Sequence, residues 1–222
     1  MQQSAWKKAL SHLFEIHIES APSDLNPHLY VSLRKGRYQL CTANAIYSYA
    51  DLYDNFYNAF TAVDFEKEQI KDVLILGFGL GSIPWMLEKN FSRNFHYTAI
   101  EADEAIIYLA NKYTLDELSS SIQLICADAF AFVFQSEEQF DLICMDIFLD
   151  DIIPDHFKDI DYLEALKARL SPNGILMFNC LSVNAKDKEL TKAFFENTFA
   201  RVFPEATYLD VKSNWILLNR PL

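Results

Sequence analysis

Three of the five glycines in this chain lie within five residues, as Gly77, Gly79 and Gly81. Glycine permits a sharp turn and lets a ligand approach the backbone closely. The apolar run 73–76 before them is typical of a buried parallel strand, and the stretch 82–89 after them is typical of a helix. A helix N-terminus presents free N–H groups and the positive end of its dipole. The cluster therefore predicts a site for a nucleoside-containing cofactor.

Acidic residues follow the later predicted strands. Glu101 stands 24 positions after Gly77, where a carboxylate could accept hydrogen bonds from both ribose hydroxyls. Asp128, next to Ala129, could accept a hydrogen bond from an adenine amino group. Asp146 ends an apolar strand, where an acid is costly unless it is used or paired. We expect these side chains to meet at the carboxyl edge of a sheet.

Each of these residues also has a structural interpretation. A glycine turn can serve packing alone, and Glu101 could be a solvated strand end. Asp103 and Asp128 could each cap a helix, since aspartate accepts from free N–H groups in a first turn. The complete set is more specific for a ligand site than any single member.

Alternating strands and helices must position these residues. Such alternation predicts an α/β fold with a doubly wound, mostly parallel, seven-stranded Rossmann-like sheet. The short link 212–213 predicts a closing antiparallel hairpin. We expect a small β-rich N-terminal region over residues 1–65 and a cofactor-binding domain over residues 66–222. The predicted strands are 14–19, 29–33, 37–42, 72–76, 96–101, 121–126, 140–146, 174–180, 205–211 and 214–219, and the predicted helices are 82–90, 103–113, 158–170 and 187–200.

Composition excludes several classes of function. The net charge is −12 and the 19 lysines and arginines are dispersed. Phosphate binding needs clustered cations, so we expect no nucleic-acid partner, whereas a cationic substrate is favoured electrostatically. No apolar run reaches the roughly 18–20 residues of a membrane helix and no signal peptide is evident, so we expect a cytoplasmic protein without a membrane partner. The four cysteines are isolated, which favours reduced core residues and no metal site.

Glycine spacing distinguishes two cofactor classes. The dinucleotide pattern G-x-G-x-x-G would place its third glycine at Ser82, but here it comes one position earlier, at Gly81. We associate G-x-G-x-G with enzymes that use S-adenosylmethionine. NAD is therefore the less favoured cofactor.

Residues 72–181 resemble spermidine synthases and their methyltransferase-like relatives, within the class I S-adenosylmethionine-dependent fold. The resemblance implies that the three glycines approach the methionine part of the cofactor, that Glu101 holds the ribose and that Asp128 and Ala129 meet adenine. It also implies that Asp146 lies beside the sulfonium and an acceptor amine, and that a homodimer is a possible assembly. The stretches that match are 73–82, 100–106, 127–130, 140–146 and 170–176.

Two departures from the synthase pattern affect the expected reaction. Leu80 stands where the synthases carry an aspartate that helps to hold the amine of decarboxylated S-adenosylmethionine. Loss of that anion favours a cofactor that keeps its carboxylate, because two negative groups repel. The synthases also carry Asp-x-x-Asp-Pro after the fourth strand of the domain, and the second aspartate is replaced here by Leu149. Asp150 and Asp151 are adjacent to it but out of register.

These features together predict a methyltransferase that uses S-adenosylmethionine on an amine or another small nucleophile. We expect Asp146 to orient the acceptor, Asp150 or Asp151 to take its proton, and Tyr47, Tyr49 and Tyr53 to line the substrate side. The first alternative is aminopropyl transfer from decarboxylated S-adenosylmethionine to a diamine. The second alternative is a cofactor-binding or partner protein without catalysis.

Overall fold

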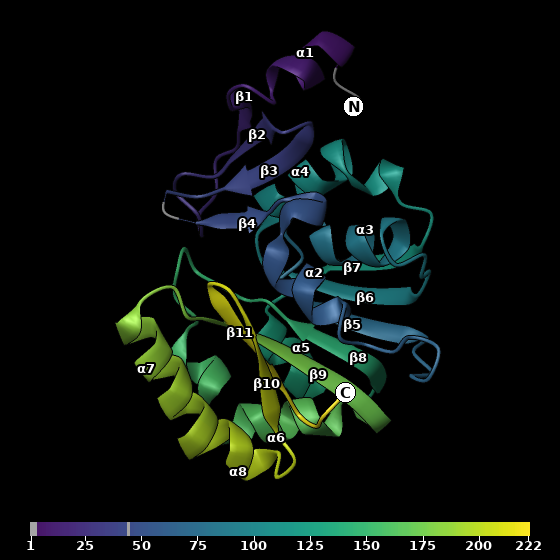
Figure 1. Cartoon of the computed structure of the whole chain (residues 1–222), viewed down its shortest axis with the longest axis vertical. Coiled ribbons are helices and arrows are strands. Elements are labelled where there is room, and N and C mark those ends of the chain that lie inside the picture. Colours follow the sequence, from purple (N-terminus) through teal and green to yellow (C-terminus); the bar gives the residue numbers. More distant parts are fainter. Residues whose placement is uncertain (1–3, 44) are drawn as a thin grey trace.

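The computed structural model describes residues 4–43 and 45–222, which form two β-sheets flanked by helices (Figure 1). The large sheet has the strand order β10-β11-β9-β8-β5-β6-β7. Strands β5 to β9 are mutually parallel, while β11 runs antiparallel to both β9 and β10. The strands are β5 Asp72–Leu76, β6 His96–Glu101, β7 Ser121–Cys126, β8 Phe140–Met145, β9 Leu170–Leu181, β10 Thr207–Val211 and β11 Asn214–Leu218.

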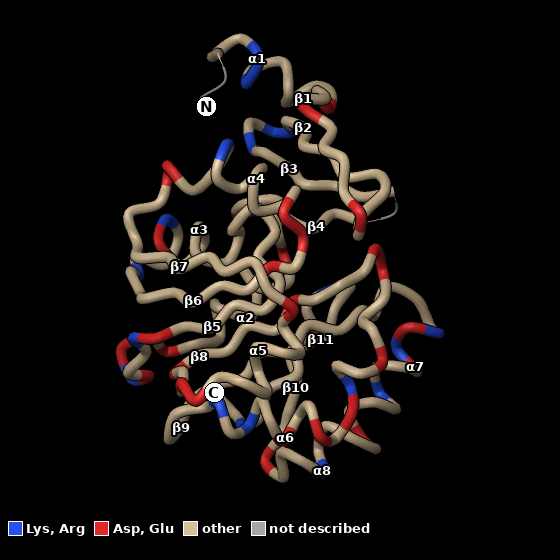
Figure 2. Tube along the Cα trace, turned by 180° about the vertical axis from the view of Figure 1, so that it is seen from behind, with Lys and Arg blue, Asp and Glu red and all other residues tan. Residues whose placement is uncertain are grey.

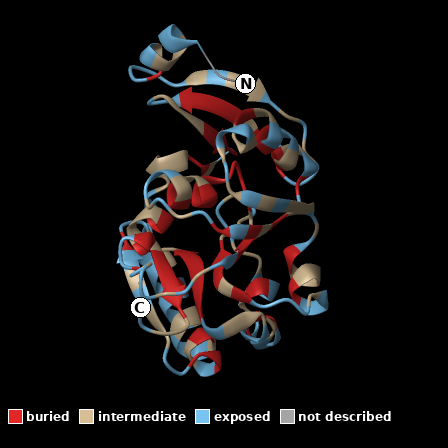
Figure 3. Ribbon diagram, turned by 90° about the vertical axis from the view of Figure 1, so that its right-hand side faces the viewer, coloured by how far each residue is buried: buried red, intermediate tan, exposed pale blue. Residues whose placement is uncertain are grey.

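Helices cover both faces of the large sheet. Val73 and Ile75 of β5 belong to a hydrophobic cluster with residues of α3 and α4, whereas Leu74 and Leu76 belong to a second cluster with residues of α5 and α6. Alternate residues of a strand point to opposite faces, so β5 is buried on both sides. Figure 3 shows the buried residues gathered on inner strands and the exposed residues on outer helices and loops. The helices are α3 Ser82–Lys89, α4 Glu104–Tyr113, α5 Ala129–Gln135, α6 Ile160–Ala168, α7 Ala185–Phe194 and α8 Ala200–Val202, with a π-helical turn Phe195–Phe199 before α8.

The small sheet is antiparallel, with the order β1-β2-β3-β4. Figure 1 shows it at one end of the molecule, with α6, α7 and α8 at the other. Its buried residues Val31 and Leu40, with Leu29 just before β2, join the same hydrophobic cluster as α3 and α4, so the two sheets pack together. Its elements are α1 Ala5–Leu10, β1 Ile16–Ser20, β2 Tyr30–Arg34, β3 Arg37–Cys41 and β4 Ile46–Ser48, followed by α2 Asp54–Phe60.

The predicted fold class is confirmed, including the seven-stranded sheet, its closing hairpin and the β-rich N-terminal region. The division at residues 65 and 66 falls between α2 and β5, and we keep it as a proposal. The lysines and arginines of the described chain are scattered from α1 to α7 (Figure 2). None of the helices in the described ranges is both long and apolar enough to cross a membrane.

Candidate functional site

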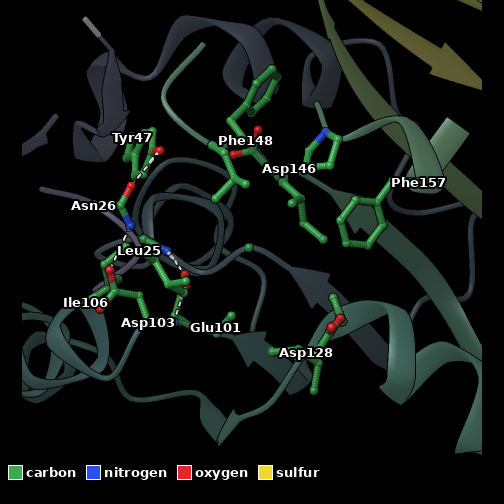
Figure 4. A pocket seen from close by; sticks show the side chains of 18 of the residues that line it. Leu25, Asn26, Tyr47, Glu101, Asp103, Ile106, Asp128, Asp146, Phe148 and Phe157 are labelled. Atoms are coloured by element: carbon green, nitrogen blue, oxygen red, sulfur yellow. Dashed lines mark hydrogen bonds between the residues drawn. The ribbon is translucent and has the colours of Figure 1, made fainter. Parts of the chain in front are cut away.

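A cavity of about 230 Å³ lies at the carboxyl ends of β5, β6, β7 and β8. In a parallel sheet this edge is where ligands bind, near the point at which the strand order reverses. Glu101, Asp128 and Asp146 line the cavity from separate strands (Figure 4). The sequence therefore predicted correctly that these three side chains share one edge of the sheet.

The glycine turn brings β5 against the end of β8. Gly77 has a φ of +87°, and a Cβ placed there would lie 2.4 Å from the carbonyl oxygen of Asp146. Gly79, at a φ of +57°, lies against Tyr47 and Ser48 of the N-terminal region. Both glycines line the cavity, where their missing side chains let a ligand reach the backbone.

Gly81 has a different position from the other two glycines. It is the N-cap of α3 with a φ of +79°, and an added Cβ would meet the ring of Phe78. Gly81 lines a second cavity, beside Leu80 and Trp85, and is absent from the lining of the first. Its predicted contact with the cofactor stays a prediction.

The half-buried carboxylate of Glu101 orders the glycine turn. Its Oε2 accepts from the backbone N–H of Phe78 at 3.1 Å and of Gly79 at 3.2 Å, while Oε1 accepts from the N–H of Asp103 at 3.1 Å. Burial raises the pKa of Glu101 despite these hydrogen bonds, which act in the opposite direction. A carboxylate offers about four acceptor positions, so capacity for a ribose hydroxyl remains.

Replacing Glu101 by alanine is expected to weaken cofactor binding by an order of magnitude or more. The variant loses the acceptor for a hydroxyl group and also releases the N–H groups of Phe78 and Gly79. Calorimetric titration of the decarboxylated cofactor into both proteins measures the change. Glu88→Ala is the control, because the Glu88 carboxylate also accepts from backbone N–H groups, those of residues 119 and 120, but lies away from the cavity. An unchanged affinity in Glu101→Ala would show that the assumed cofactor position is wrong.

Asp128 and Ala129 form the adjoining wall of the cavity. Asp128 is the N-cap of α5, and its side chain accepts from the N–H of Phe130 at 2.7 Å, which confirms the helix-cap interpretation. Ala129 is buried, and the aromatic residue Phe157 lines the same cavity. An apolar wall next to a carboxylate suits an adenine ring, and the adenine contact stays a prediction for both residues.

Asp146 is the half-buried acid at the end of β8. Its Oδ1 accepts from the Tyr53 hydroxyl at 3.2 Å and from Asn179 Nδ2 at 2.7 Å. Burial, together with repulsion from nearby Glu101, raises the pKa of Asp146 to about 6, although the two hydrogen bonds act to lower it. A carboxylate with this pKa can accept a proton near neutral pH.

Tyr47 and Tyr53 line the cavity as expected, but besides Gly81 three residues predicted for catalysis or substrate binding do not. Asp150 has a φ of +56° and its carboxylate accepts from Thr42 Oγ1 at 2.6 Å, toward the small sheet. Asp151 is exposed in a separate groove beside α7. Tyr49 is buried outside the cavity. In this loop the cavity is lined by apolar residues, among them Ile147, Phe148 and Leu149.

A chain of hydrogen bonds that the sequence did not predict forms the N-terminal wall of the cavity. The N–H of Asp150 donates to Tyr47 Oη at 2.5 Å, and the Tyr47 hydroxyl donates to Asn26 Oδ1 at 2.9 Å. Asn26 Nδ2 donates to Asp103 Oδ2 at 2.7 Å. Asp103 is also the N-cap of α4, as the sequence indicated. These bonds tie the loop after β8 to the N-terminal region.

A doubly wound sheet of this order, with a glycine turn and a ligand cavity at its carboxyl edge, defines the class I S-adenosylmethionine-dependent fold. A probable spermidine synthase from Corynebacterium glutamicum shares the fold, with a TM-score of 0.68 and 16% identity over 91% of this chain and 78% of that one. The model of the spermine/spermidine synthase domain family matches residues 60–212. The chain therefore belongs to the spermine/spermidine synthase family.

Two curated relatives extend this comparison. A probable polyamine aminopropyl transferase from Bifidobacterium longum is 25% identical over 148 residues, which are 67% of this chain and 32% of that protein. A polyamine aminopropyltransferase from Vibrio vulnificus is 27% identical over 115 residues, which are 50% of this chain and 38% of that protein. The matched stretch thus covers only 32% and 38% of the lengths of these two relatives.

The methyltransferase interpretation of the sequence is wrong, because the matching family is that of the spermine and spermidine synthases and both relatives are named as aminopropyltransferases. That interpretation assumed that the side chain at position 80 faces the cofactor. In the structure Leu80 is 3% exposed, packs in the hydrophobic cluster and is absent from the lining of the main cavity. A leucine in that position carries no information about a cofactor carboxylate.

Proposed function

We propose that the protein is an aminopropyltransferase of the spermidine synthase type, with decarboxylated S-adenosylmethionine as donor and a diamine as acceptor. The observation that carries the proposal is the charge of the cavity. Four carboxylates line it, those of Glu101, Asp103, Asp128 and Asp146, and no lysine or arginine is among the described residues that do so. Both substrates of aminopropyl transfer are cations, and an acidic cavity attracts them.

The acidic lining of the cavity favours the decarboxylated form of the cofactor over the intact one. Intact S-adenosylmethionine carries a carboxylate, which needs a cationic partner when it leaves water. The decarboxylated form carries an ammonium group and a sulfonium, and both are complementary to carboxylates. Glu101 would hold the ribose, Asp128 and Ala129 the adenine, and Gly77 and Gly79 the sulfonium side. The donor supplies an aminopropyl group on an activated sulfur. The amine nitrogen bonds to the aminopropyl carbon, the bond from that carbon to sulfur breaks, and the sulfur leaves in the neutral thioether methylthioadenosine.

Asp146 would act as the base. An amine that arrives as an ammonium must lose a proton before it can attack carbon, and a carboxylate with a pKa of about 6 can accept it. Both donors to Asp146 bind Oδ1, and Oδ2 has no partner in the described parts of the chain, so it is the oxygen free for the amine. Tyr53 fixes the carboxylate from the N-terminal side. Otherwise the reaction mainly requires alignment of the reactants.

Incubation with putrescine and each form of the cofactor tests this function. We expect spermidine from the decarboxylated form and no methylated amine from the intact form, both measured by mass spectrometry. Methylated product from the intact cofactor alone would contradict the proposal. Binding of the decarboxylated cofactor without turnover over a panel of diamines would instead support a non-catalytic protein.

The cytoplasmic location and the homodimer expected from the sequence stay predictions. The proposed reaction depends on neither of them, because the described residues of one chain supply every carboxylate named for the cavity.

A further inference from the structure

Two asparagines connect Asp146 to the tip of the C-terminal hairpin. Asn214, the first residue of β11, donates from Nδ2 to Asn179 Oδ1 at 2.8 Å. Asn179, on β9, donates from Nδ2 to Asp146 Oδ1 at 2.7 Å. In the β9–β11 pairing Asn179 stands opposite Ile216, two residues from Asn214, so both asparagines lie on one face of the sheet.

The position of Asn179 restricts its side chain. It is 2% exposed, in an otherwise apolar stretch of β9 that includes Phe178 and Cys180. A buried amide needs partners at both its oxygen and its NH2 group. Which end faces Asp146 depends on the partner at the other end, because a primary amide can turn over without a change of shape. Ionised Asp146 only accepts and so takes the NH2 group of Asn179, and Asn214 supplies the donor that the oxygen of Asn179 then needs.

We propose that Asn214 is a positioning residue for the base. By holding the oxygen of Asn179, it keeps the NH2 group of Asn179 directed at the Asp146 carboxylate. This inference rests on the proposed function, in which Asp146 takes the proton of the acceptor amine. Asn214 is absent from the lining of the cavity and acts only through Asn179.

The groups around Asp146 give the direction of the expected effect. Tyr53 donates to the carboxylate, and Glu101 on β6 raises the pKa of Asp146 by repulsion. His156 lines the same cavity from the loop after β8, and Cys144 lies on the same strand as Asp146. The hydrogen bond from Asn179 lowers the pKa of Asp146, so the reversed amide, with its oxygen toward the carboxylate, raises it.

Asn214→Asp tests the inference. A carboxylate only accepts, so residues 214 and 146 then compete for the NH2 group of Asn179, and the orientation with the oxygen toward Asp146 gains in population. We expect the pKa of Asp146 to rise by about one unit, the scale on which a charged hydrogen bond shifts a carboxylate. The measurement is a ¹³C NMR titration of the carboxyl carbons in the free protein, with the Asp146 signal assigned through Asp146→Asn.

Ser213→Asp is the matched control, because it adds the same charge at the neighbouring exposed residue, whose side chain has no hydrogen bond in the described parts of the chain. Equal pKa values for Asp146 in the two variants would overturn the proposal. If Asn214→Asp does not fold, Asn214→Ala is compared with Ser213→Ala in the same titration, and equal values again overturn it.

The titration needs no substrate, so a failure of the proposed role of Asn214 can be distinguished from a failure of the proposed function. Absence of putrescine turnover by the unaltered protein contradicts the proposed function and leaves the titration result as it is. If turnover occurs, the acidic limb of the plot of kcat against pH is expected to shift to higher pH in Asn214→Asp, by the same amount as the pKa of Asp146. A residue with a merely structural role would lower stability without moving this limb.

Discussion

Asp146→Asn is expected to lower kcat for spermidine formation by about 100-fold to 10,000-fold, the contribution of a positioned acid or base. The asparagine oxygen can still accept from Tyr53 and Asn179, so the fold and the cavity are preserved. Affinity for the decarboxylated cofactor is expected to change little, because Glu101 and the glycine turn hold the donor. Steady-state kinetics and calorimetry on the same preparation separate the two effects.

The pH dependence of the unaltered protein supplies a second test of Asp146. Only the ionised carboxylate accepts a proton, so kcat is expected to rise with pH up to about 6 and then to level, following the pKa of Asp146. The Asp146→Asn variant should lack this limb. A limb that persists in the variant would mean that another group is the base.

Asp151→Asn distinguishes this assignment from the expectation drawn from the sequence. Asp151 is exposed outside the cavity, so we expect kcat to be retained in this variant. A loss comparable to that of Asp146→Asn would restore Asp151 as the proton acceptor.

The parts of the site that follow from strand ends could be predicted from the sequence. Glu101 and Asp146 each end a strand that is apolar enough to identify, and parallel strands bring their carboxyl ends to one edge. Helix α5 was anticipated only as a helix that Asp128 could cap. Its sequence, Ala-Phe-Ala-Phe-Val-Phe-Gln, alternates between aromatic and small residues and therefore lacks a clear helical period.

The parts that depend on side-chain direction could not be predicted from the sequence. Leu80 turns into the core, and Asp150 turns toward Thr42, because the left-handed backbone at Gly79, Gly81 and Asp150 redirects the chain. The sequence does show Asn179 as a polar residue in an apolar strand, and such a residue indicates a buried hydrogen-bond partner. Its partners, Asp146 and Asn214, lie 33 and 35 positions away, beyond any local pattern.

Gly77→Ala is expected to destabilise the protein by about 3 kcal/mol or more, since strained backbone costs about 1–3 kcal/mol and a backbone clash is added to it. The new Cβ would lie 2.4 Å from the Asp146 carbonyl oxygen, so β5 or the end of β8 must move. That movement displaces the base from the glycine turn. We therefore expect a lower midpoint in urea unfolding together with a loss of kcat in the folded variant.

Gly81→Ala separates the clash from the backbone strain. Its φ of +79° is close to the +87° of Gly77, so the conformational cost of a side chain is similar at both positions. The Cβ at position 81 would instead meet the tip of the Phe78 ring, which can turn aside more readily than a backbone carbonyl. We expect the smaller destabilisation and nearly unchanged kcat in Gly81→Ala. Equal losses of kcat in the two variants would mean that the position of Asp146 does not depend on its contact with Gly77, and that the whole glycine turn acts as a unit.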